Sequence, residues 1–295
     1  MLKDYVCRKQ ANSVAIHSKI KLFLGREPGI DLFMAKKILF IGDIVGKPGR
    51  QILKSHLSAY VRKHDIDFVI ANGENAASGA GISKSLANEI HSAGVDIITL
   101  GDHVWDQKGF NLEIDELPNL CRPANLPEIC PGKDLVIFEK NGFKLGVVTL
   151  LGQTFMKISS SPMLQKIDDL LPELKEQCDA IVVEIHAEAT SEKIAMGFYL
   201  DGKVSLVVGT HTHVPTADAS ILPMGTAYQT DAGMTGPYHS VLGREIEPII
   251  ARMRDGMPRR FPVASDNVML CGCMVTLKED GLAQKIEMVK IHKFE

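Results

Sequence analysis

The chain repeats a pattern in which a short apolar run is followed by polar residues and then by a segment with helical periodicity. Residues 38–41, 68–71 and 96–100 are apolar runs of strand length. Residues 51–63 and 83–93, which follow the first two runs, carry apolar side chains at helical spacing. Alternating strands and helices are typical of α/β proteins, so we expect a layered α/β fold.

The second half of the chain continues this alternation but adds antiparallel signals. Residues 136–139 and 144–150 flank Asn141-Gly142, a dipeptide that favours a tight hairpin turn. The pattern therefore predicts mixed rather than purely parallel sheets. Further helices are predicted at residues 167–175, 190–199 and 244–254, and further strands at residues 180–185, 205–209, 227–230, 268–277 and 282–291.

The first 33 residues differ from the rest of the chain. They mix basic residues with short apolar clusters and end in a Gly- and Pro-containing turn, and Met34 then opens a sequence that reads like a new start. We expect residues 1–33 to be an N-terminal appendage. The 295-residue chain is long enough to bury a sizeable core, and we expect residues 34–295 to form a single domain.

Composition excludes several classes of protein. A net charge of −3 gives no general attraction to nucleic-acid backbones or anionic membranes. No apolar run has the length of a membrane span, and the start of the chain lacks the pattern of a signal peptide. We therefore expect a cytoplasmic protein without membrane partners. The six scattered cysteines are expected to be reduced core thiols.

Residues 205–215, S-L-V-V-G-T-H-T-H-V-P, point to a metal site. The apolar run reads as a buried strand that ends at Gly209 and places His211 and His213 on the following loop. Imidazole is the commonest metal ligand, so two histidines just past a strand suggest a metal site completed by residues from elsewhere.

Other strand ends supply candidate partners for these two histidines. In open α/β sheets the carboxyl ends of strands are where ligands bind, so polar side chains at these ends are expected along one edge. The set consists of Asp43, Glu74, Asn75, Asp102, His103, His186, His211 and His213.

The chemistry of this set fits two divalent cations that share Glu74 as a bridging carboxylate. Imidazole together with carboxylate oxygen suits Zn, Fe or Mn rather than Ca or Mg. Two metals about 3.5 to 4 Å apart form a clamp for in-line displacement at phosphorus. The sequence therefore predicts a phosphoesterase.

Structural explanations compete with the functional one for some of these residues. A single histidine is more often a hydrogen-bonded residue near the core, but five strand ends that all carry metal-type side chains are hard to explain in this way. Glu184 and Glu188 could form salt bridges or support a metal ligand, and both are interpreted as structural. Asp231 is interpreted as a carboxylate that could orient a ligand histidine. The segment at residues 42–48 lacks the spacing of a P-loop.

Several long segments carry a resemblance to a known family. They are F-I-G-D-I-V-G-K-P-G-R, N-G-E-N-A-A, G-D-H-V-W-D, R-P-A-N, H-A-E-A-T-S-E-K, V-V-G-T-H-T-H-V and D-A-G-M-T-G-P. From residue 36 to residue 291 the chain resembles the calcineurin-like metallophosphoesterases and, within them, the YmdB-like bacterial phosphodiesterases. The resemblance implies a layered α/β/β/α sandwich with mixed sheets and a dimetal site at the carboxyl ends of strands.

The resemblance also implies roles for individual residues. One metal would be held by Asp43, Glu74, Asn75 and His213, and the other by Glu74, Asp102, His186 and His211. His103 would be the general acid. The family pattern carries Asn where this chain has Asp102, and the carboxylate is a stronger, charged ligand.

The function implied is that of a metal-dependent phosphodiesterase acting on 2′,3′-cyclic nucleotides. A hydroxide bridging two divalent or mixed-valence ions, iron or manganese with zinc as an alternative, would attack phosphorus while the histidine protonates the leaving oxygen. A nucleotide-binding regulatory protein with weak catalysis and a phosphomonoesterase remain alternatives. The sequence does not decide whether the chain forms homo-oligomers. It also does not exclude RNA ends as substrates.

Overall fold

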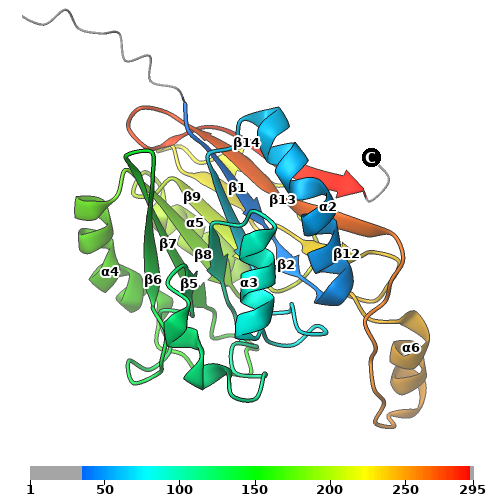
Figure 1. Cartoon of the computed structure of the whole chain (residues 1–295). Coiled ribbons are helices and arrows are strands. Elements are labelled where there is room, and N and C mark those ends of the chain that lie inside the picture. The colour runs from blue at the N-terminus through cyan, green and yellow to red at the C-terminus, as the bar shows by residue number, and fades with distance from the viewer. Residues whose placement is uncertain (1–34, 293–295) are drawn as a thin grey trace, which may run out of the picture. The chain divides into compact units, whose positions relative to one another are not determined.

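The computed structural model describes residues 35–292, and the predicted appendage at residues 1–33 lies outside them. Two mixed β-sheets form the centre of the described part (Figure 1). The first sheet has the strand order β2 (Asp43–Ile44), β12 (Met234–Pro237), β13 (Val268–Leu277), β1 (Lys37–Ile41), β3 (Phe68–Asn72), β4 (Ile97–Thr99) and β5 (Leu120–Cys121), with β14 (Ala283–His292) paired to β13. The second has the order β10 (Ser220–Ile221), β11 (Ala227–Gln229), β9 (Leu206–Thr210), β8 (Ala180–His186), β7 (Phe143–Leu151) and β6 (Leu135–Lys140).

Helices cover the outer face of each sheet. α2 (Gly46–His64) and α3 (Lys84–Ser92) pack on the first sheet, and α4 (Met163–Gln177) and α5 (Thr190–Leu200) pack on the second. Two short 3₁₀ helices, η1 (Phe110–Leu112) and η2 (Ile114–Glu116), lie in the long connection between β4 and β5. The predicted α/β/β/α arrangement is confirmed.

Alternation along the strands explains the layers. Ile38 and Phe40 of β1 belong to the apolar cluster between the two sheets, whereas Leu39 and Ile41 belong to the cluster beneath α2 and α3. Successive side chains of a strand point to opposite faces, so a strand between two layers must be apolar on both. All five residues of β3 are buried for the same reason.

Parallel pairing brings strand ends to a common edge within each sheet. In the first sheet β1 pairs with β3, β3 with β4, and β4 with β5, all in parallel. In the second sheet β7, β8 and β9 are likewise parallel. The predicted hairpin of β6 and β7 is antiparallel and turns at Asn141 and Gly142, both of which have positive φ.

Several predicted boundaries were wrong, including those of the first helix and of the strand before His211. The first helix begins at Gly46 rather than at residue 51, because Pro48 and Gly49 lie in its first turn, where a missing N–H is tolerated. Gly209 does not end its strand, since β9 continues to Thr210. A Cβ at Gly209 would lie 1.7 Å from the Thr230 carbonyl oxygen, so glycine is needed for close packing of the two backbones.

α6 (Ile246–Asp255) stands away from the sheets at the lower right of Figure 1. In the described part of the chain, no residue of α6 is buried. It starts two residues later than predicted, with Pro248 in its first turn. Among residues 35–292, every helix is too short or too polar to cross a bilayer.

Candidate metal centre

The structure brings the predicted site residues together from both sheets. The first sheet supplies the residues that begin β2 or follow β3 and β4, and the second supplies the residue that ends β8 and those that follow β9. All eight lie at these strand ends, namely Asp43, Glu74, Asn75, Asp102, His103, His186, His211 and His213.

Four of these side chains form a tight group. One nitrogen or oxygen atom from each of Glu74, Asp102, His186 and His211 lies within 4.8 Å of the others. His186 Nε2 is 3.2 Å from Glu74 Oε1 and 3.1 Å from Asp102 Oδ1. His211 Nδ1 is 3.1 Å from His186 Nε2 and 3.3 Å from Asp102 Oδ1. Two carboxylates and two imidazoles therefore aim at one point.

Gly101 makes this convergence possible. A Cβ at this position would lie 2.3 Å from both Glu74 Oε2 and His186 Nε2. Any larger residue would displace the carboxylate and the imidazole from each other.

The group has a strongly negative potential. Burial alone would lower the pKa of His186, but the Glu74 charge and the Asp102 hydrogen bond outweigh burial and raise it well above its usual value. Burial would raise the pKa of Asp102, yet hydrogen bonds with His186 and His211 lower it. The pKa of Glu74 is also lowered, because the charge and hydrogen bond of His186 outweigh its burial. A potential that holds a proton on a buried imidazole would also attract a metal cation.

A second group lies next to the first. His213 Nε2 is 3.9 Å from Asp43 Oδ1 and 3.3 Å from Asn75 Nδ2, and Asn75 Nδ2 donates to Glu74 Oε1 at 2.9 Å. Asp43 is fully buried, and its Oδ1 has no hydrogen-bond partner among residues 35–292. Burying a carboxylate oxygen without a hydrogen-bond donor costs free energy, so a bound cation is the expected partner of this oxygen. The donor set fits the implied metals.

His103 lies beside these groups without joining them. Its backbone N–H donates to Glu74 Oε2 at 3.1 Å, and its Nδ1 lies 2.6 Å from Asp106 Oδ2. A carboxylate on Nδ1 orients the ring and leaves Nε2 for proton transfer. His103 also lines a cavity of about 350 Å³ together with Glu74, Asn75, Gly79, Glu188, His211, Thr212, His213, Val241, Leu242, Arg244 and Ile249.

A model of the YmdB-like protein family matches residues 39–289. The chain belongs to this family. A 2′,3′-cyclic-nucleotide 2′-phosphodiesterase of Bacillus subtilis (strain 168) is 46% identical over 257 residues, which cover 87% of this chain and 97% of that protein.

Two crystal structures agree with this membership. A hypothetical protein from Thermus thermophilus has 42% identity and a TM-score of 0.81, over 87% of this chain and 99% of that chain. A phosphatase from Mycoplasma pneumoniae has 35% identity and a TM-score of 0.81, over 88% of this chain and 94% of that chain.

Sequence reasoning missed part of the hydrogen-bond network in this YmdB-like protein. Glu184 was interpreted as structural, yet its Oε1 accepts from Thr210 Oγ1 at 2.6 Å and from Asn72 Nδ2 at 2.7 Å. Thr210 Oγ1 in turn lies 2.9 Å from His186 Nδ1, and Asn72 Oδ1 accepts from the Glu74 N–H. Burial raises the pKa of Glu184 to about 7. The signal in the sequence was a carboxylate inside an apolar strand.

This network orients the ligand atom of His186. Because Thr210 donates its hydroxyl proton to Glu184, it accepts from His186 Nδ1. In the neutral ring this leaves the lone pair on Nε2, the atom that faces Glu74 and Asp102. The contact of Asp106 with His103 was missed as well, although a carboxylate three residues after a histidine can reach its ring. Glu188, also interpreted as structural, reaches His211 Nε2 at 3.1 Å with a half-exposed side chain.

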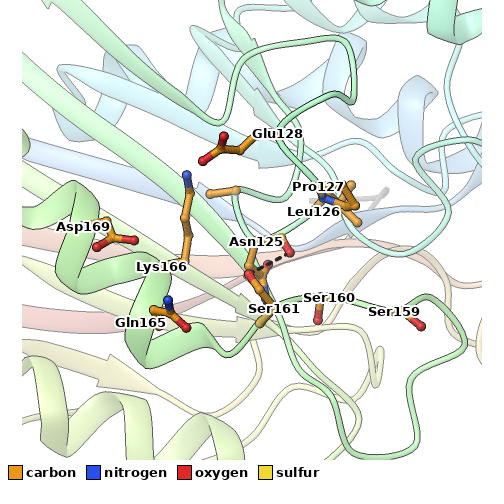
Figure 2. A pocket seen from close by; sticks show the side chains of 11 residues that line it. Asn125, Leu126, Pro127, Glu128, Ser159, Ser160, Ser161, Gln165, Lys166 and Asp169 are labelled. Atoms are coloured by element: carbon orange, nitrogen blue, oxygen red, sulfur yellow. Dashed lines mark hydrogen bonds between the residues drawn. The ribbon is translucent and has the colours of Figure 1, made fainter.

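A cavity of about 400 Å³ is lined by residues of the connection after β5, of the segment before α4 and of α4 itself (Figure 2). Asn125 ties its wall together, since its Nδ2 donates to the carbonyls of Leu151 and Ser161. Lys166 on its rim pairs with Asp134. None of its lining residues belongs to the candidate metal centre, so the smaller cavity at His103 is the candidate active site.

Proposed function

We propose that this YmdB-like protein hydrolyses phosphodiester bonds, with 2′,3′-cyclic nucleotides as the leading substrate class. The chain is an enzyme of a family whose relatives carry the names phosphodiesterase and phosphatase. The substrate class follows the name of the Bacillus subtilis relative, which covers nearly the same length. The expected location remains the cytoplasm.

The observation that carries the proposal is the convergence of buried carboxylates and imidazoles, with Asp43 Oδ1 left without a donor among the residues described. Asp43, Glu74, Asn75 and His213 would hold one metal ion, and Glu74, Asp102, His186 and His211 the other. When bound, two such ions polarise a phosphoryl oxygen and lower the pKa of a water molecule. Iron or manganese suits this mixture of nitrogen and oxygen ligands.

His103 would supply the proton for the leaving oxygen. Its ring reaches the cavity from the loop after β4, and Asp106 fixes Nδ1, so Nε2 is the atom that would hold and release the proton. General acid catalysis of this kind contributes about 10² to 10⁴-fold. The hydrogen bond from the His103 N–H to Glu74 Oε2 holds the acid at a fixed position beside the metal ligands.

The rest of the cavity would bind the nucleoside. Val241, Leu242 and Ile249 form an apolar wall, and a cavity of about 350 Å³ is larger than a phosphate group requires. The Arg244 guanidinium lines the same cavity and donates to backbone carbonyls of Ser78, Gly79 and Phe261. A charge held by neutral oxygens remains available to attract an anion.

Hydrolysis of 2′,3′-cyclic AMP by protein supplied with Mn²⁺ tests the proposal. We expect a nucleoside monophosphate as product, and loss of turnover by about 10³-fold in a Glu74→Gln variant, which removes the shared carboxylate charge. Glu176→Gln is the matched control, because Glu176 is exposed on α4 and does not line the cavity. Binding of the cyclic nucleotide without turnover would favour a regulatory protein instead.

A phosphomonoesterase is the second candidate, because the related Mycoplasma pneumoniae structure is described as a phosphatase. Measuring kcat/KM for p-nitrophenyl phosphate and bis-p-nitrophenyl phosphate on one preparation separates the two activities. We expect the diester to be the better substrate. A preference for the monoester would reverse the assignment.

A further inference from the structure

We infer that the buried pair Lys193–Asp231 positions the loop that carries His211 and His213, and that it thereby sets the affinity of the centre for metal. The inference rests on the proposed metal centre. It concerns two residues that lie outside the candidate ligand set and outside the cavity at His103.

The loop adopts a backbone conformation that its residues disfavour. His211 has φ 92° and His213 has φ 65°, both in the left-handed region that costs free energy for residues with a Cβ. Such a conformation persists only when surrounding contacts over-determine it. The question is which contacts hold it.

Asp231 provides contacts on the near side of His213. Its Oδ2 accepts from the Thr212 N–H at 3.2 Å and from Thr212 Oγ1 at 2.6 Å. Its Oδ1 accepts from the Gly233 N–H at 2.8 Å. Thr212 is the chain neighbour of both histidines. By binding Thr212, this carboxylate restrains the backbone on either side of it, where the two positive φ angles lie.

Asp231 also holds the far side of His213 through its backbone. The Asp231 N–H donates to Thr216 Oγ1 at 2.9 Å, and the Asp231 carbonyl accepts from the Thr216 N–H at 3.1 Å. His213 is therefore anchored both before and after it in the sequence. The two rings would then face their metals before any metal binds.

Lys193 completes the arrangement from α5. Its ammonium is 2.8 Å from Asp231 Oδ2, and its side chain is 1% exposed. The aliphatic part passes Gly209, where a Cβ would lie 2.8 Å from Lys193 Cδ. Removing one member of a buried ion pair leaves the other uncompensated, so the pair should act as a unit.

The test compares Mn²⁺ binding by metal-free wild-type protein, Asp231→Asn and the control Asp201→Asn, by calorimetric titration. We expect Asp231→Asn to bind about 10- to 100-fold more weakly, the effect typical of losing a residue that orients metal ligands. Asp201 accepts from the N–H groups of Met224 and Thr226, which precede β11, whereas Asp231 follows it, so the Asp201 variant should keep wild-type affinity. Circular dichroism checks that each variant is folded.

A milder variant covers the case in which Asp231→Asn does not fold. Thr212→Val removes the hydroxyl donor but keeps the N–H, and we expect about tenfold weaker binding, the lower end of the effect of losing an orienting contact. Wild-type affinity in a folded Asp231→Asn or in Thr212→Val would overturn the inference. Failure of the wild-type protein to bind Mn²⁺ would instead overturn the proposed metal centre.

Discussion

The resemblance of motifs implies that the family carries Asn at the position where this chain has Asp102. Its Oδ1 is close to ring nitrogens of both His186 and His211, and both hydrogen bonds favour the ionised carboxylate. An amide of the same shape would keep an oxygen at this point but not the negative charge. Removing this charge should therefore lower the affinity for metal more than the stability of the fold.

We predict that Asp102→Asn weakens Mn²⁺ binding by about tenfold, the lower end of the range for a perturbed ligand shell, and leaves the fold intact. Calorimetric titration of the metal-free protein measures the affinity, and circular dichroism checks the fold. Equal affinity and equal turnover in the two proteins would show that the charge has no role.

We predict that His103→Ala retains the metal content of the wild type but loses turnover by about 10² to 10⁴-fold. Asp106→Asn should lose less, because it removes the orienting charge and keeps the imidazole. Elemental analysis and initial rates on the same preparations separate the two effects. A collapse of metal content in His103→Ala would make His103 a ligand rather than an acid.

At the scale of elements, the long strands and their polar ends could be predicted from the sequence. Period and composition located β1, β3, β8 and β9, because each is a short apolar run with a metal-type residue at its end. Strands defined by their partners could not be predicted. β2 and β12, for instance, pair with each other although they lie far apart in the chain, and residues 234–237 read as a Gly-rich loop.

We predict that Gly209→Ala lowers the free energy of unfolding by about 3 kcal/mol, the upper part of the range for overpacking. The clash is with the backbone oxygen of Thr230, which cannot rotate away. Urea unfolding measures the change. Gly142→Ala is the control, since a Cβ there meets no atom within 4 Å and only its positive φ is strained.

At the scale of the whole molecule, the candidate centre is a junction between the two sheets. Glu74 and Asp102 come from the first sheet and His186 and His211 from the second, while the bond from Asn72 to Glu184 links the sheets. Patterning shows that a strand is buried on both faces, but not which faces meet. The strand-end pattern therefore identified the candidate residues, and the resemblance of motifs assigned each of them to one of the two metals.

We predict that a chain starting at Met34 folds and binds metal like the full chain. The family match begins at residue 39, and β1 begins at Lys37, so the elements that carry the candidate centre all lie downstream. Thermal unfolding and Mn²⁺ titration of both proteins check this. Loss of solubility or of metal binding in the shorter chain would show that residues 1–33 are needed.

The proposed centre takes residues from both sheets to hold two metal ions. The most direct test is the number of Mn²⁺ ions retained per chain after gel filtration, measured by elemental analysis on wild type and on Glu74→Gln. We expect about two ions per wild-type chain, as in two-metal hydrolytic sites, and fewer than one in the variant that lacks the shared carboxylate. A wild type that retains no metal, or a variant that retains as much as the wild type, would contradict it.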